Sequence, residues 1–450
     1  MNTFLFKEFE GTSPIAWKQK IQVDLKGADY NETLLWTTNE GLTVKPFYTK
    51  EDKTNHTINL SKSAFKICQK IIISDEKKAN TLTIDALKRG ASAIQFVAKK
   101  KFDPAILFDK IDFKSFTVYF KFTFLDAEFI HEISKRIPSD NCFFQTDIIG
   151  SLAEVGNWFV NLKEDYKALN SAVSTVENSI SVSGDLYQNA GANMVQQLAY
   201  SLAHANEYLN HFGAENAHKI HFQFSVGSNY FHEIAKLRAF RLLWESLLNE
   251  YNIEGIAAHL FVTPSTRNKT IYDYNVNMLR TTSECMSAIL GGSNTISNSS
   301  YDGVYAESNE FGERISRNQL LILQQESGFK DAQNIAEGSY YIESLTQQMA
   351  EKALIIFKQI EKGGGFIKQL KEGNIQRKLK ENSTKEETQF LKKELILLGT
   401  NLQPNKENFM KGSLEVDPFV KKRNIKTLFP PIIRKRLSEN LEKERLKEES

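Results

Sequence analysis

The sequence predicts an α/β fold: a (β/α)8 TIM barrel with an extended N-terminal arm and a charged, partly helical C-terminal tail. Eight short apolar runs, typical of buried strands, recur between residues 66 and 300. Amphipathic patterns with apolar residues every three or four positions separate these runs, as in 193–212 and 231–248. Eight strand and helix units over about 250 residues match the scale of such a barrel.

The chain divides into three expected regions. Residues 1–60 form the arm, because turn signals at Gly27, Gly41 and Pro46 occur among scattered aromatics without sustained periodicity. Residues 61–365 form the barrel, with strand candidates that begin at Lys66, Ser92, Ser115, Asn141, Asn178, His218, Glu254 and Thr295. The last of these strands is the most polar, so it is the weakest of the eight predictions.

Residues 366–450 form the charged extension. The barrel is expected to end near Gly363-Gly364-Gly365, after which the composition becomes strongly charged. Pro430-Pro431 precedes a polar, charge-alternating pattern that predicts a solvated helix. Acidic residues interleave the basic ones there, which argues against an arm that binds nucleic acid.

Composition narrows the classes of function. Lys and Arg total 57 against 55 Asp and Glu, so the net charge of +2 gives no broad attraction to nucleic acid or anionic membranes. The three cysteines, Cys68, Cys142 and Cys285, lie far apart and suggest neither a disulfide framework nor a zinc cluster. No apolar run reaches the roughly 18 residues of a membrane helix, and the N-terminus lacks a signal-peptide pattern. A cytoplasmic protein is expected.

Individual polar residues give weak signals. His218 and His221 have H-x-x-H spacing, but packing is favoured over zinc because no third ligand follows. His204 is expected as a partly exposed helix residue rather than a ligand. Glu154 and Glu326 could form the carboxylate pair of a hydrolytic barrel, although nothing in the sequence brings them together. No metal site is expected.

One strand-to-helix junction resembles a known family. Residues 184–192 read G-D-L-Y-Q-N-A-G-A, similar to the G-Y-H-M-Q-E-A-G-A segment of methylmalonyl-CoA mutases. Leu186 occupies the position of that family's pocket histidine. Further similar segments follow the family's order and cover most of residues 24–361: 24–27, 40–48, 229–239, 277–282, 290–292, 298–302, 314–318, 325–328 and 338–340.

Other segments depart from the family's pattern. The R-P-W-T-I-R-Q-Y-A-G-F motif expected after Tyr48 is absent, and the H-C-Q-T-S-G strand end is replaced by residues 258–265, in which His259 is followed by Pro264. No D-x-H-x-x-G loop is present. Only 85 residues follow Gly365, too few and too charged for the roughly 130 residues of a flavodoxin-like cobalamin domain.

The resemblance implies the small (beta) subunit of a heterodimeric methylmalonyl-CoA mutase, in a short form without a cobalamin-binding domain. The complex would interconvert methylmalonyl-CoA and succinyl-CoA in propionate metabolism, with adenosylcobalamin bound by the large catalytic partner and none in this chain. This chain would be non-catalytic and have no catalytic residue. Tyr187, Gln188 and His259 are the candidates for lining a remnant pocket.

The arm would wrap the partner through Trp17, Tyr30, Trp36 and Phe47, because aromatic anchors are common in stable interfaces. Core packing within the chain would use the same residues. Two alternatives stay open. One is an active acyl-CoA mutase barrel that takes cobalamin from a separate binding chain, and the other is a homomeric barrel with a different chemistry that needs no partner.

Overall fold

Eight parallel strands form the predicted barrel. The computed structural model describes residues 8–53, 57–58, 60, 64–332, 334–421 and 425–449. The strands are β3 (Lys66–Ile73), β4 (Ala93–Ala98), β5 (Thr117–Phe122), β6 (Cys142–Phe144), β7 (Ile180–Ser183), β8 (Ile220–Val226), β9 (His259–Pro264) and β10 (Thr295–Ile296). Their spatial order is β6-β5-β4-β3-β10-β9-β8-β7. All eight strand predictions are confirmed, and the weakest of them is the two-residue β10.

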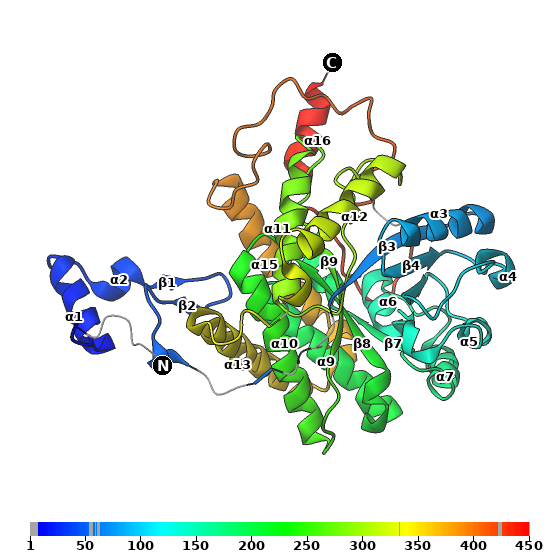
Figure 1. Cartoon of the computed structure of the whole chain (residues 1–450), viewed down its shortest axis with the longest axis horizontal. Helices are drawn as coiled ribbons and strands as arrows, with labels where there is room; N and C mark the ends of the chain where they lie inside the picture. The colour runs from blue at the N-terminus through cyan, green and yellow to red at the C-terminus, as the bar shows by residue number, and fades with distance from the viewer. Residues whose placement is uncertain are drawn as a thin grey trace.

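The two ends of this sheet meet and nearly close it. The backbone N–H of Phe144 donates to the carbonyl of Asn178 at 2.9 Å, and that of Ser181 donates to the carbonyl of Thr146, also at 2.9 Å. These bonds join β6 to β7, so the sheet wraps into a barrel with helices around it (Figure 1).

Helices connect the strands and cover the outside of the barrel. They are α3 (Glu76–Lys88), α4 (Pro104–Leu107), α5 (Ala127–Ser134), α6 (Ile148–Val155), α7 (Leu162–Val173), α8 (Gly184–Asn189), α9 (Met194–Phe212), α10 (Tyr230–Glu250), α11 (Val276–Leu290), α12 (Glu310–Gln325) and α13 (Tyr340–Lys362). Side chains of Asp75, Asp126 and Asp147 accept hydrogen bonds from the first turns of α3, α5 and α6, which explains where these helices begin. Short 3-10 helices span Lys50–Asp52, Ser139–Asn141, Ala214–Lys219 and Phe329–Asp331.

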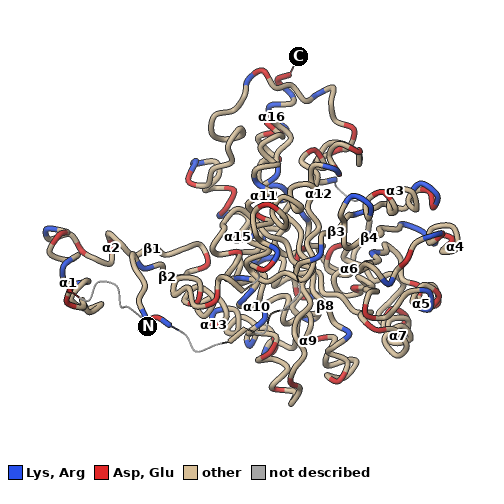
Figure 2. Tube along the Cα trace, viewed as in Figure 1, with Lys and Arg blue, Asp and Glu red and all other residues tan. Residues whose placement is uncertain are grey.

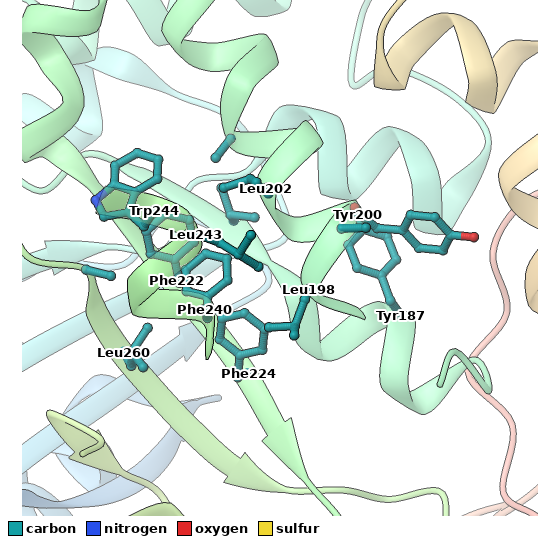
Figure 3. Close-up of a cluster of buried hydrophobic side chains, with 14 of the residues drawn as sticks. Tyr187, Leu198, Tyr200, Leu202, Phe222, Phe224, Phe240, Leu243, Trp244 and Leu260 are labelled. Atoms are coloured by element: carbon teal, nitrogen blue, oxygen red, sulfur yellow. The ribbon is translucent and has the colours of Figure 1, made fainter. Parts of the chain in front are cut away.

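The largest hydrophobic core lies between strands and helices. On β8, Phe222 and Phe224 face outward and meet the Phe240 ring on α10 at 4.6 and 4.7 Å, while Trp244 packs on Phe222 at 4.9 Å (Figure 3). Alternate residues of β8 face into the barrel, as Gln223 does when it bonds Ser181 of β7. The barrel interior therefore contains polar side chains together with an aromatic cluster of Tyr119, Phe143 and Phe261, whereas the shell around it is apolar.

The arm projects from one side of the barrel (Figure 1). It contains two helices that the sequence analysis missed, α1 (Pro14–Asp24) and α2 (Tyr30–Leu34), followed by the hairpin β1 (Trp36–Thr37) and β2 (Thr43–Val44). The side chains of Ser13 and Asp29 cap these helices, and Pro14 occupies the first turn of α1. Apolar periodicity is absent from α1 because none of its residues is buried.

The C-terminal extension packs along the barrel. It contains α14 (Phe366–Lys371), α15 (Asn374–Leu391) and α16 (Glu439–Glu448), of which α15 and α16 are joined by a long irregular segment. The predicted terminal helix is present, but it is not solvated on all sides. Glu439 and Glu442 are buried, because Arg436 pairs with Glu442 at 2.6 Å and the backbone N–H of Ile271 donates to Glu442 at 3.0 Å.

Charged residues of both signs are mixed along the chain, and the described helices contain no long apolar stretch. Basic and acidic segments are interspersed over the elements in Figure 2, including both signs along α16. Among the described residues, every helix falls short of the length and apolarity that crossing a bilayer would require.

Candidate functional site

The candidate site is the mouth of the barrel at the carboxyl ends of the strands, where barrel enzymes place their chemistry. The C-terminal strap, residues 425–438, crosses this mouth. Its backbone donates from Leu428 to Gly156 at 2.9 Å and from Ile432 to Ala153 at 2.8 Å, next to the end of α6. It then bonds Asn189 at the end of α8 and Arg267 after β9. The strap therefore spans the loops that follow β6, β7 and β9.

Arg434 is the central side chain of the strap. Its Nε donates to Glu154 Oε1 and its Nη1 to Asp185 Oδ2, both at 2.7 Å. Burial raises the pKa of the Asp185 carboxyl, but the charges of Arg434 and then Lys121 outweigh it and hold that pKa below its usual value. Asp185 directly follows the junction of β7 and α8, so the cation of the strap neutralises a carboxylate at the mouth.

Arg267 fastens the strap to the rest of the extension. Its Nη1 donates to the carbonyl of Lys435 at 2.9 Å and its Nε to Glu386 of α15 at 2.7 Å. Gly191 lies against this arginine with φ of +95°, and a Cβ there would meet Ser383 at 2.8 Å and the Arg267 guanidinium at 2.9 Å. Only glycine fits this approach without a shift.

Below the strap, the polar side chains inside the barrel bond to one another. Gln95 donates to Gln145 at 2.6 Å, Gln223 donates to Ser181 at 2.9 Å, and Lys121 donates to Gln223 at 3.3 Å. Such mutual bonds satisfy groups that a substrate would otherwise have to satisfy. Other polar atoms there, Gln145 Nε2 and both ring nitrogens of His221, have no hydrogen-bond partner among the described residues.

His259 lies deep in the barrel rather than at its mouth. It is the first residue of β9, so about 16 Å of strand separates it from Pro264 at the carboxyl end. Its Nε2 pairs with the Tyr119 hydroxyl at 2.8 Å, and its ring stacks on Phe143 at 4.4 Å. Burial, together with the nearby charge of Arg241, lowers its pKa to about 3, so the imidazole is neutral at pH 7.

Leu186 and Tyr187 belong to the core of the shell. Leu186 is fully buried. The Tyr187 hydroxyl pairs with His204 Nδ1 at 2.9 Å, and its ring meets Tyr200 edge-on at 5.6 Å (Figure 3) and Phe366 at 5.8 Å. Tyr187 therefore points toward α9 and α14.

The expectation of a partly exposed His204 is wrong. The side chain is fully buried, because its two ring nitrogens meet Tyr187 and the carboxylate of Asp147, the latter at 2.9 Å. Tyr208 also donates to Asp147, at 2.7 Å. Burial raises the pKa of Asp147, but His204 and these hydrogen bonds outweigh it and lower that pKa. Apolar periodicity of α9 gave no sign of this partner, which lies 57 residues away in sequence.

Gln188 hydrogen-bonds to both members of a buried ion pair. Lys236 Nζ lies 2.5 Å from Glu233 Oε2, and both side chains have no exposed surface. Gln188 donates to Glu233 and accepts from Lys236, each at 3.0 Å. The amide therefore ties α8 to α10 through one hydrogen bond on each of its two polar atoms.

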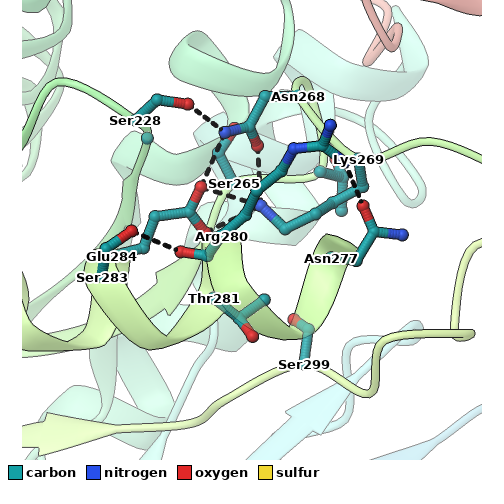
Figure 4. Close-up of polar contacts among 12 residues, drawn as sticks. Ser228, Ser265, Asn268, Lys269, Asn277, Arg280, Thr281, Ser283, Glu284 and Ser299 are labelled. Atoms are coloured by element: carbon teal, nitrogen blue, oxygen red, sulfur yellow. Dashed lines mark hydrogen bonds and ion pairs between the residues drawn. The ribbon is translucent and has the colours of Figure 1, made fainter. Parts of the chain in front are cut away.

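A second buried ion pair lies beside the loop after β9. Lys269 Nζ lies 2.7 Å from Glu284 Oε2, and Asn268 donates to the other oxygen of Glu284 at 2.6 Å (Figure 4). Burial raises the pKa of Glu284, even though Lys269 opposes the shift. Arg280, in the same cluster, donates to Asn277 at 2.8 Å and to the carbonyl of Leu398 at 2.8 Å. Lys269 and Glu284 therefore neutralise each other, whereas Arg280 donates to neutral acceptors.

The two histidines with H-x-x-H spacing and the two candidate carboxylates, Glu154 and Glu326, also lie apart. His218 pairs with Glu177 at 3.2 Å, whereas His221 lies inside the barrel beside His259, with ring centroids 6.4 Å apart. Over the described ranges, no three His, Cys, Asp or Glu side chains come together as metal ligands would. Glu154 is paired with Arg434, and Glu326 lies at the end of α12.

The extension does not fit a flavodoxin-like cobalamin domain. Its described residues form three helices and irregular segments, with one isolated bridge between Leu398 and Leu402 in place of a parallel sheet. The described residues of the extension therefore offer cobalamin no binding domain of that kind.

Comparison with known proteins places the chain in a family. The family model described as methylmalonyl-CoA mutase matches residues 99–448. The methylmalonyl-CoA mutase small subunit of Porphyromonas gingivalis is 32% identical over 448 residues, which cover 89% of this chain and 71% of that one. The methylmalonyl-CoA mutase of Rhizobium meliloti is 38% identical over 234 residues, 50% of this chain and 33% of that one.

The methylmalonyl-CoA mutase large subunit of Propionibacterium freudenreichii is 32% identical over 243 residues, 52% of this chain. The match spans about a third of the length of that protein and of the Rhizobium protein. With the (β/α)8 barrel and a family model over more than three quarters of the residues, this chain belongs to the methylmalonyl-CoA mutase family.

Proposed function

We propose that this chain is the small, non-catalytic subunit of a heterodimeric methylmalonyl-CoA mutase. A large subunit would bind adenosylcobalamin and interconvert methylmalonyl-CoA and succinyl-CoA, and this chain would support it. The observation that carries the proposal is the C-terminal strap, whose Arg434 occupies the mouth of the barrel between Glu154 and Asp185.

The strap supports a non-catalytic role for a physical reason. A substrate entering the mouth would have to displace Arg434 and leave the buried Asp185 carboxylate without its cation, which is costly. Leu186 supports the same conclusion, because its side chain offers no donor or acceptor to a thioester.

The arm supports a partner. Among the described residues, nothing buries a residue of α1. An isolated helix of 11 residues is marginal in water, so a second surface would stabilise it. Trp17 and Trp36 are 51% and 54% exposed and could anchor such a surface. Phe47 stacks on Trp17 at 4.8 Å, whereas Tyr30 is buried within the arm, with Lys18 over its ring, and is a weaker anchor candidate.

The test is copurification. The chain, tagged, is coexpressed with a complete mutase large subunit, and both the complex and the lone chain are assayed with adenosylcobalamin and methylmalonyl-CoA. We expect a one-to-one complex with turnover and no turnover by the lone chain. Turnover by the lone chain would support the alternative of an active barrel that takes cobalamin from elsewhere and would overturn the proposal.

Two arm variants sharpen this test. Removal of residues 1–35, which spares the core residue Leu42, or the pair Trp17→Ala and Trp36→Ala, should abolish copurification while the barrel stays folded. Phe311→Ala is the matched control, because Phe311 is a 47% exposed aromatic on α12, away from the arm in Figure 1. Copurification of the truncated chain at full yield would remove the arm from this role.

A further inference from the structure

A groove of about 950 Å³ lies among α7, α9 and α14, and involves no residue of the strap or the barrel interior. Four lysines line it: Lys163 and Lys167 from α7, and Lys368 and Lys371 from α14. The volume is within the range of small-molecule sites. We propose that this groove binds a small polyanion that carries a planar ring, of the class of nucleoside polyphosphates.

The lysines converge because of their spacing. Lys163 and Lys167 are four residues apart, as are the pair Asn170 and Tyr166, so one face of α7 lines the groove. Lys368 and Lys371 are three residues apart on α14. The turn at Gly364 and Gly365, with φ of +99° and +90°, leads directly into α14 and is suited to glycine.

Among the described residues, the four groove lysines lack close carboxylate partners. Of the described carboxylates, none forms an ion pair with Lys163, Lys167 or Lys371, and Lys368 reaches Glu372 only at 4.0 Å. The one carboxylate of the lining, Glu207, accepts from the backbone N–H of Ile367 at 2.9 Å. Four lysines against one glutamate leave the groove attractive to phosphate groups.

Helix stability explains only part of this arrangement. Lys368 and Lys371 lie near the end of α14, where a cation favours the helix dipole. Lys163 lies in the first turn of α7, where a cation opposes the dipole. Lys163 thus destabilises its own helix and lines the groove with three other lysines. A role in binding an anionic ligand explains this position better than a role in stabilising the fold.

Rings and apolar side chains form the rest of the lining. The rings of Tyr166 and His211 meet at 4.0 Å between centroids. Burial lowers the pKa of His211, which favours the neutral ring, and this ring lines the same groove as the lysines. Leu162 and Ile367 add apolar surface. A base stacked on such rings, with phosphates on the lysines, is the recognition mode seen where proteins hold nucleotides without base-specific contacts.

The test uses the full chain in isothermal titration with ATP, and with tripolyphosphate as a polyanion without a ring. We expect saturable ATP binding that weakens as salt increases. The pair Lys163→Gln and Lys371→Gln should weaken it by about tenfold or more. Lys380→Gln, an exposed lysine of α15 outside the lining, is the matched control and should change nothing.

The ring is tested separately. His211→Ala should weaken ATP but leave tripolyphosphate unchanged, and His211→Phe should restore ATP binding. Absence of saturable binding by either probe, or ATP binding indifferent to the two groove lysines, would overturn the site. Equal loss of both probes in His211→Ala would overturn the planar component of the ligand. None of these outcomes depends on a partner subunit, so they leave the proposed function untouched.

Discussion

Removing the cation of the buried ion pair on α10 should destabilise the whole barrel. Lys236 donates to Gln188 and Gln197 at 3.0 and 2.9 Å and to the carbonyl of Ser225 at 2.7 Å, besides its pairing with Glu233. Lys236→Met keeps the length of the side chain but leaves a fully buried carboxylate without its cation. The cost of such an orphaned charge is about 3–5 kcal/mol.

The structure places the expected cost at the lower end of that range. Glu233 Oε1 keeps the backbone N–H of Gly227 at 2.7 Å and the Gln188 amide at 3.0 Å after the lysine is lost. We therefore expect a loss of about 3 kcal/mol, roughly a hundredfold in the unfolding equilibrium. Adding Glu233→Gln removes the orphaned charge, so the double variant should recover at least about 1 kcal/mol.

Urea titration followed by tryptophan fluorescence measures both effects as shifts of the midpoint. Lys378→Met is the control, because Lys378 pairs with Glu381 on the surface of α15 and should leave the midpoint unchanged. A loss below about 1 kcal/mol in Lys236→Met, or a double variant no more stable than the single one, would refute the reasoning from burial.

Three further outcomes follow from other buried groups. His259 takes up a proton near pH 6.5 in the unfolded chain but only near pH 3 in the folded one. The free energy of unfolding should therefore fall by about 2 kcal/mol between pH 7 and pH 5. The urea midpoint of His259→Gln should fall correspondingly less over the same pH range. Leu186→Ala should cost about 2–5 kcal/mol in the same titration and leave the turnover of the complex unchanged, whereas a large change in turnover at normal stability would place Leu186 in the chemistry. Gly191→Ala should loosen the strap, since its Cβ would press on Arg267 and Ser383, and faster tryptic cleavage within 425–438 than in Gly412→Ala would show it.

Much of the fold could be predicted because the barrel repeats one simple pattern. Apolar runs marked all eight strands, and even β10 followed from its place in the series. The helices of the arm could not be predicted from periodicity, since α1 buries nothing and so needs no apolar face. Their signals were instead the capping residues Ser13 and Asp29, which mark helix starts without hydrophobic pattern.

The site was less accessible to sequence reasoning because its contacts are distant in sequence. Arg434 lies 249 residues from Asp185, and charge alternation in the tail did not distinguish this arginine from solvated ones. Tyr187 and Gln188 follow a strand end, a position typical of pocket residues, yet they bond to side chains of α9 and α10. The direction of a side chain at a strand-to-helix junction depends on the helices behind it, which periodicity does not give.

The buried networks also explain what the family motifs in this chain accomplish. Gln188 and Asn189 come from the segment 184–192, and Glu233 and Lys236 from the segment 229–239. Gln188 bonds both members of the ion pair, and Asn189 accepts from Ser265 at 3.0 Å. The two segments thus fasten each other and the loop after β9.

These contacts hold the barrel of this chain together whether or not it turns over a substrate. Their match to the family therefore supports the fold and says nothing about catalysis by this chain. Chemistry must be judged instead at the few positions that face the mouth, where Arg434 of the strap lies against Asp185. That is why the decisive experiment compares the complex with the lone chain.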